Sequence, residues 1–286
     1  TVKEFAYTLV ATRFLYDGWI LKRTEPDSSD SKNSLPWSLQ HLKQNEKKNN
    51  IWYPVDSFNT TTIKNNNTNT INNIHNCILQ LQSCLRVSYT SFSTMPWVTN
   101  ILYFLWQNRI NPDLQGEAVL KHLEEIAINE IKNINNDKYF TQGTSTPRIL
   151  FNFLDYLLWR YGLITTPSDD IKLRNNFQFS YWNTVEHWSP QTPDTNYDQS
   201  SWPSSNQSID IFGNLFLING SDNSALSNKP PHEKVPRLKK KIIEGLKVSL
   251  KAIDMMQATP NTDCSLWQKN CKILENAHRQ LLQAAI

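Results

Sequence analysis

Glycine is scarce in this chain of 286 residues, which contains only 7 of them. Loops that wrap a nucleotide phosphate with backbone amides need closely spaced glycines, in patterns such as G-x-x-x-x-G-K or G-x-G-x-x-G. Neither pattern occurs in the sequence. The scarcity therefore excludes nucleotide-driven motor chemistry built on such a loop.

Long apolar runs are also missing. The longest, Ile101–Trp106, is far shorter than the ~20 residues that a membrane-spanning helix needs. The amphipathic start, which contains Lys3, Glu4 and Arg13, is unlike a signal peptide. We therefore expect no membrane partner and predict a cytoplasmic protein.

Cysteines are few, and their spacing is regular. Cys77 and Cys84 are seven residues apart, as are Cys264 and Cys271. On a helix this spacing puts two sulfurs on one face about two turns apart, which is too far for an easy disulfide. No C-x-x-C pair suits zinc. We expect reduced thiols that face a core, which fits a cytoplasmic location.

Aromatic residues, by contrast, are plentiful, with 10 Trp, 10 Tyr and 12 Phe to anchor a core. Apolar residues at helical spacing predict helices over 2–23, 71–85, 96–107, 114–133 and 147–161. Residues 25–68 are polar and irregular, and we predict a loop there. The length allows two domains, and the first is predicted to be helical and to span residues 1–163.

The second predicted domain spans residues 164–286 and has a different texture. Strand-like segments end at Val185–His187 and cover Ile209–Ile218, with a long polar loop over 191–207 between them. A short helix capped by Ser221 or Asp222 is expected next. One long basic helix should follow Pro236 as far as Ile253, and a last helix should span 265–284.

The order of polar residues in this second half is that of a one-metal ββα phosphodiesterase site. Glu186-His187 ends one apolar segment, Asn214 starts another, and Asn223 lies in the short helix. Hydrolysis of a phosphodiester at neutral pH needs a base, and imidazole titrates near that pH. We therefore predict that His187 activates water.

The other three residues complete the predicted site. Mg²⁺ or Mn²⁺ prefers oxygen ligands and keeps several waters, so Glu186 and Asn223 would suffice as protein ligands. Asn214 would hold the imidazole through its side-chain amide. Alternatively, Asn214 is a turn residue after Gly213 and Asn223 is a helix cap. Glu186 and His187 share a site only where the strand ends or bends, because adjacent side chains on a strand point to opposite faces.

A basic segment follows the predicted site. The net charge of +3 is too small to indicate a nucleic-acid partner by itself. The cations that gather in this segment are Lys234, Arg237, Lys239, Lys240, Lys241, Lys247 and Lys251. We predict that they contact a DNA backbone, and the alternative is a solvated helix face.

These motifs also resemble a known family. The run that carries the resemblance is Phe177-Gln178-Phe179, Val185-Glu186-His187, Pro190-Gln191, Gly213-Asn214-Leu215, Asn223-Ser224, Asn228-Lys229 and Lys234. It is similar to the C-terminal nuclease domain of GmrSD-type restriction proteins, a branch of the His-Me finger (HNH) nucleases. Its layout also resembles the HNH module of RNA-guided DNA endonucleases. The segment from Phe5 to Lys22 looks like the helical region that precedes the nuclease in GmrSD-type proteins.

The resemblance implies that His187 activates water, that Glu186 and Asn223 face the metal, and that Asn214 supports the histidine. It further implies defence against foreign or modified DNA and a partner domain or subunit that is an NTPase or senses modification. The predicted fold is mainly α with a small ββα-metal (His-Me finger) element in the C-terminal part.

The predicted function is that of a divalent-metal-dependent DNA endonuclease. One alternative is a non-catalytic DNA-binding or assembly module that docks onto an NTPase subunit. A second is a ribonuclease with the same site.

Overall fold

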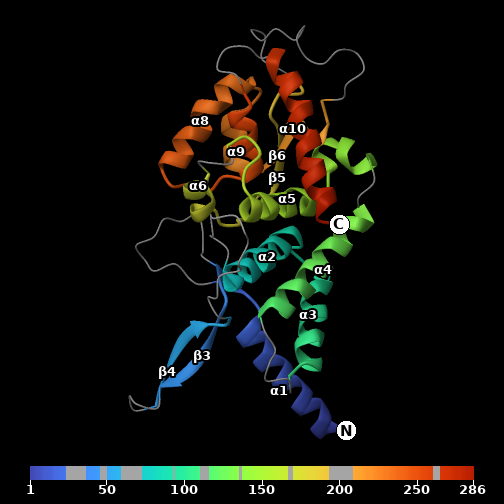
Figure 1. Ribbon diagram of the computed structural model, residues 1–286, viewed down its shortest axis with the longest axis vertical. Coiled ribbons are helices and arrows are strands. Elements are labelled where there is room, and N and C mark those ends of the chain that lie inside the picture. The colour runs from blue at the N-terminus through green and yellow to red at the C-terminus, as the bar shows by residue number, and fades with distance from the viewer. Residues whose placement is uncertain are drawn as a thin grey trace. The chain divides into compact units, whose positions relative to one another are not determined.

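Helices make up most of the part of the chain that is described in the computed structural model (Figure 1). The described residues are 1–23, 37–45, 50–58, 73–91, 93, 95–109, 116–134, 137–166, 170–192, 209–259 and 265–286. Of the helices within these ranges, none has the length and apolar character required to cross a membrane. The predicted mainly α composition is confirmed.

The chain divides into two compact units, Thr1–Ala127 and Ile128–Ile286. The boundary lies earlier than the predicted 163/164 and falls inside helix α4 (Gly116–Ile134). The reason is helix α5 (Arg148–Tyr161), which packs on the strand pair and on helices of the C-terminal unit. Its buried face therefore completes the core around the candidate site.

In its described residues, the N-terminal unit contains three further helices and two small antiparallel strand pairs. Its elements are α1 (Val2–Trp19), β1 (Lys22–Arg23), β2 (Trp37–Ser38), β3 (Gln40–Asn45), β4 (Ile51–Asp56), α2 (Ile74–Ser88) and α3 (Pro96–Gln107). Strand β1 pairs with β2, and β3 pairs with β4. The α2 helix supplies much of the core, and its Cys77 and Cys84 are buried thiols that face this core, as predicted.

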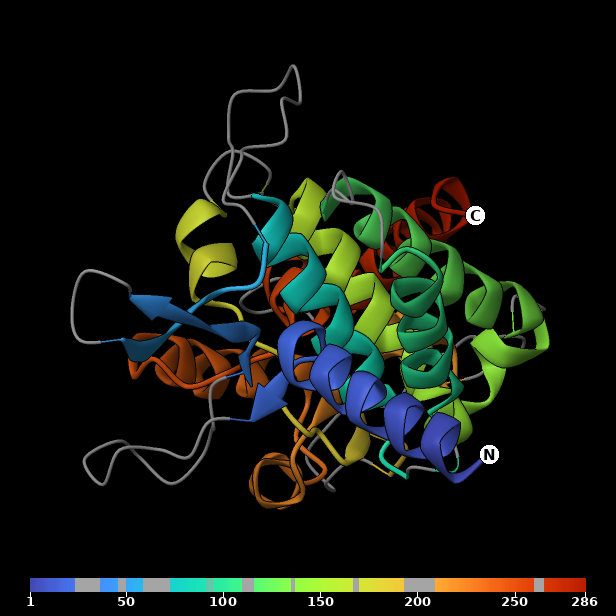
Figure 2. The ribbon, with the colours of Figure 1, turned by 90° about the horizontal axis from the view of Figure 1, so that it is seen from below.

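The β3–β4 hairpin corrects the prediction of a continuous loop over 25–68. Its pairing runs from Gln40↔Asp56 to Asn45↔Ile51, and the hairpin projects from the helices of its unit (Figure 2). Most of its side chains are exposed on both faces, so the apolar alternation that marks a half-buried strand is absent.

The C-terminal unit places one strand pair among helices. Its elements are η2 (Asp137–Thr141), η3 (Gly143–Ser145), α5, α6 (Ile171–Asn176), β5 (Thr184–His187), η5 (Phe212–Asn214), β6 (Leu215–Ile218), α7 (Gly220–Leu226), α8 (Pro231–Ile243), α9 (Leu250–Gln257) and α10 (Ser265–Ala284). Helices α5 and α9 pack against β6, and α10 packs against η5 (Figure 1). Cys271 on α10 is buried and free, and Cys264 lies outside the described residues.

The long basic helix predicted after Pro236 is two helices. Helix α8 begins at Pro231, contains Pro236 and ends at Ile243. Gly245 then adopts φ +71°, and Ser249 caps α9 through its side chain. A backbone with positive φ ends a helix and suits glycine. The break directs Lys251, on α9, into the core.

Candidate active site

Strands β5 and β6 form an antiparallel pair that leads directly into helix α7. Thr184 pairs with Ile218 and His187 with Leu215. The cap of α7 is Asn219, whose side chain accepts a hydrogen bond from Asp222 N, whereas the sequence predicted Ser221 or Asp222. The order strand, strand, helix is that of the predicted element, and α7 packs against β5.

His187 is the last residue of β5, where the strand ends. The ring is buried, and its Nε2 lies 2.8 Å from Asp210 Oδ1. Among the described residues, Nδ1 has no hydrogen-bond partner. An ionised Asp210 accepts from Nε2–H, which places the imidazole lone pair on Nδ1. The ring therefore presents its basic nitrogen away from the carboxylate.

Asp210 was missed by the sequence reasoning. It lies 23 residues after His187, so no spacing linked the two, although it is the first acidic residue after the polar loop. Its Oδ1 also accepts from Gln191 Nε2 at 3.0 Å. Both donors hold the carboxylate beside the ring.

The absence of a side chain at Gly143 allows Asp210 to lie close to it. The Gly143 amide donates to the Asp210 carbonyl at 3.1 Å, and the φ of Gly143 is +57°. A Cβ at this position would lie 2.6 Å from Asp210 Oδ1. Glycine is required here for both the backbone angle and the space.

Glu186 is paired with a buried lysine. Its Oε1 accepts from Lys234 Nζ at 2.7 Å, and the same ammonium donates to the carbonyl of His187. Burial lowers the pKa of Lys234, and the charge of Glu186 opposes this shift. Lys234 therefore holds the carboxylate and the strand end together.

Asn214 is engaged through its whole side-chain amide. Its Oδ1 accepts from Ser189 N at 2.9 Å and from Trp267 Nε1 at 3.2 Å, while Nδ2 donates to the carbonyls of Ser189 and Ile209 at 3.0 Å each. The predicted bond to the imidazole is therefore absent, because every donor and acceptor of the amide is already used. Asn214 instead fixes the backbone two residues after His187.

Asn223 lies inside α7 and does not cap it. Its Oδ1 is buried and has no hydrogen-bond partner among the residues that the structure describes. A buried acceptor without a partner costs free energy, and an amide oxygen is a ligand that Mg²⁺ accepts. No cluster of three or more His, Cys, Asp or Glu suited to a metal occurs in the described ranges. Glu186 and Asn223 supply oxygen donors, which are the kind that a hard cation accepts.

The predicted DNA-binding cations fall into two groups. Arg237, Lys239 and Lys240 are exposed on α8, and Lys247 is half-buried and bonded to Gln178. Lys234 and Lys251 are 0% exposed. The predicted DNA contact by these last two finds no support in their placement, because their ammonium groups are directed into the protein.

Comparison with known proteins places this half of the chain in a family. Residues 127–270 match the family described as GmrSD restriction endonucleases, C-terminal domain. No curated protein and no solved structure was found to match. The match covers half of the chain and includes the strand pair, α7 and the basic helix. The chain therefore belongs to the family of the GmrSD restriction endonuclease C-terminal domain.

Proposed function

We propose that this chain hydrolyses phosphodiester bonds of DNA with His187 as the general base, in a reaction that depends on a divalent cation. The observation that supports this most is the state of the imidazole, which is paired through Nε2 with Asp210 and has no partner at Nδ1 among the described residues. A base must reach a water molecule while its other nitrogen is held.

In the proposed reaction, His187 Nδ1 takes a proton from water as the water oxygen bonds to phosphorus. The bond from phosphorus to the 3′ oxygen breaks, and the leaving oxygen takes a proton from solvent water, which leaves a 5′ phosphate and a 3′ hydroxyl. Asp210 stabilises the imidazolium that forms, and Asn214 keeps the loop after His187 in place.

Glu186 and Asn223 are the residues that would hold Mg²⁺ or Mn²⁺. The partnerless Asn223 Oδ1 supports this assignment. A bound cation supplies neutralisation of the charge that develops on the phosphate and on the leaving oxygen.

The exposed cations of α8 are the proposed DNA contacts. Arg237, Lys239 and Lys240 lie on the surface of the helix that also carries Lys234. We propose that they and Lys247 neutralise backbone phosphates, which fixes the register of the duplex without reading its sequence.

The family description names restriction. We propose that the DNA cut is foreign or modified and that an NTPase or modification-sensing domain or subunit selects it in the cytoplasm. When the chain is immobilised, we expect it to retain such a partner, which is detected by its ATP or GTP hydrolysis. A partner without nucleotide hydrolysis or modified-DNA binding would contradict it.

Supercoiled plasmid tests the reaction. With Mg²⁺ or Mn²⁺ the parental protein should nick it, and EDTA should stop this. His187→Ala should lower the rate about 10²–10⁴-fold, the usual contribution of a general base. His122→Ala, in α4 of the other unit, is the matched control and should cut at the parental rate. Parental cleavage by His187→Ala would contradict His187 as the base, whereas no cleavage by the parental protein would support the non-catalytic alternative.

A further inference from the structure

Two buried ammonium groups bind the end of the β5–β6 pair that carries His187. Lys234 reaches it from α8 and donates to the carbonyl of His187. Lys251 reaches it from α9 and donates to the carbonyls of Phe212 at 2.8 Å and Leu215 at 2.5 Å. His187 and Leu215 are direct partners across the two strands. The two lysines therefore hold both strands at one rung.

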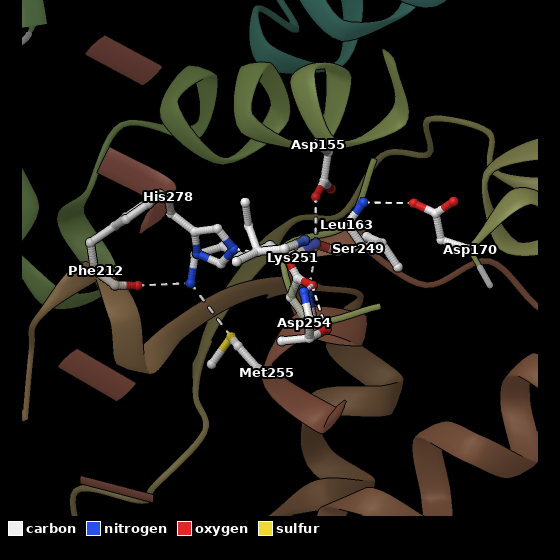
Figure 3. Close-up of polar contacts among 12 residues, drawn as sticks. Asp155, Leu163, Asp170, Phe212, Ser249, Lys251, Asp254, Met255 and His278 are labelled. Atoms are coloured by element: carbon white, nitrogen blue, oxygen red, sulfur yellow. Dashed lines mark hydrogen bonds and ion pairs between the residues drawn. The ribbon is translucent and has the colours of Figure 1, made fainter. Parts of the chain in front are cut away.

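The Lys251 ammonium makes no ion pair within the described part of the chain. It also contacts Met255 Sδ at 3.4 Å and lies over two aromatic rings, 4.7 Å from the centroid of Phe212 and 6.0 Å from that of Phe151. Figure 3 shows the group between Phe212 and Met255. Burial lowers the pKa of Lys251 to about 8. Burying a cation costs free energy, and an apolar side chain of similar volume often serves stability as well.

The backbone of Lys251 is anchored independently of its ammonium. Asp155 Oδ1 accepts from Lys251 N at 2.7 Å and from Ser249 Oγ at 3.1 Å (Figure 3). Further along α9, Asp254 accepts from His278 Nε2 at 3.0 Å and from Thr165. The helix is thus fixed on α5 and α10, and the side chain of Lys251 extends from a rigid base.

The carbonyls that Lys251 holds bracket the turn that carries Asn214. Phe212 begins η5 and Leu215 begins β6. Asn214 then binds Ser189, and its carbonyl accepts from Trp188 N at 2.8 Å. One chain of contacts runs from Lys251 through this turn to the segment after His187, and the other runs directly from Lys234 to His187.

We propose that Lys234 and Lys251, which together we name the lysine clamp, are positioning residues that fix the strand end bearing the general base. This rests on the proposed function of His187. Without either ammonium, the strand end loses contacts to its backbone carbonyls, although the Phe212 carbonyl keeps its hydrogen bond from Leu215 N. The strand end then moves, and the imidazole loses its alignment with water and phosphate. Displacement of a reacting group by about 1 Å lowers rates about 10²-fold.

The kinetic test uses Lys234→Met and Lys251→Met, with exposed Lys121→Met on α4 as the matched control. Each clamp variant should lower kcat about 10²-fold, with KM, DNA affinity and its salt dependence unchanged. Lys121→Met should match the parental protein in all four. Weaker DNA binding with a shallower salt dependence would overturn the proposal in favour of direct DNA contact. A lower melting temperature with parental kcat would overturn it in favour of stability alone.

Nuclear magnetic resonance tests the clamp without cleavage. The parental protein should show two lysine ammonium ¹⁵N signals protected from solvent exchange, each lost in its own Met variant. The carbonyl ¹³C signal of His187 should shift in Lys234→Met, and that of Leu215 in Lys251→Met. Absence of the protected signals in the parental protein overturns the clamp even where a variant does not fold. Their presence in a protein that cuts no DNA supports the clamp and contradicts the proposed function.

Discussion

Asp210→Asn tests how the imidazole is held. The change keeps the size of the side chain and removes its charge, so the imidazolium that forms during the reaction loses its carboxylate partner at 2.8 Å. A hydrogen bond to a charged group contributes about 1.5–3 kcal/mol. The Asp210 side chain is 36% exposed, and water replaces part of the lost interaction. The lower half of that range applies, which corresponds to a fall in kcat of about 10–40-fold.

The assay is single-turnover nicking of plasmid under saturating metal and protein. Asp17→Asn is the matched control, because that carboxylate is 45% exposed and ion-paired with Arg13 on α1. It should leave the rate unchanged, and both variants should melt close to the parental temperature. A parental rate in Asp210→Asn would refute the reasoning that this carboxylate supports the base.

Four further predictions follow from single contacts. Asn223→Ala should abolish metal-dependent cleavage and change the free energy of unfolding by less than about 0.5 kcal/mol, because its Oδ1 has no partner among the described residues. Asn214→Ala should lower the free energy of unfolding by roughly 2–4 kcal/mol in denaturant melts, since it leaves buried donors without an acceptor. A larger loss of stability in Asn223→Ala than in Asn214→Ala would contradict both roles. Gly143→Ala should lower the free energy of unfolding by more than about 1 kcal/mol, because Gly143 has a positive φ, whereas Gly220→Ala at the start of α7 should not. Equal losses of stability in the two variants would contradict this. Burial raises the pKa of Asp155 from 3.8 to about 7, so the folded state binds a proton that the unfolded state has lost. The free energy of unfolding should therefore fall as pH rises between these values, by at most about 1.4 kcal/mol per pH unit. Asp155→Asn should flatten that fall, and an unchanged pH profile of stability would contradict this role. Removing Lys239 and Lys240 together should reduce the slope of log affinity against log salt by nearly two, at about 0.9 per phosphate, measured by anisotropy, and an unchanged slope would make them a solvated face.

Helices could be predicted from the regular spacing of their apolar residues. Helix α10 spans Ser265–Ala284 and α3 spans Pro96–Gln107, as predicted, because apolar residues repeat at helical spacing along each. The β3–β4 hairpin has no such pattern, since its side chains are exposed on both faces. The hairpin therefore gave no periodic signal from which it could be predicted.

The site residues that could be predicted are those whose chemistry and local order in the sequence both indicated a role. The Glu186-His187 pair could be placed at a strand end from the sequence, and β5 ends at His187. Asp210 could not be found, because its link to His187, 23 residues earlier in the chain, arises only from folding. The burial of Lys234 and Lys251 was hidden for a related reason: a lysine in a basic run has the same sequence signature whether its ammonium meets solvent or a backbone carbonyl.

Chemical rescue tests the role of His187 most directly. His187→Gly removes the imidazole and leaves a space beside Asp210, the residue that His187 contacts. Free imidazole added to this variant should restore DNA nicking in proportion to its concentration, and products should carry 5′ phosphate and 3′ hydroxyl ends. A folded His187→Gly variant that nicks at the parental rate without imidazole, or that gains nothing from imidazole at any concentration, would contradict His187 as the general base.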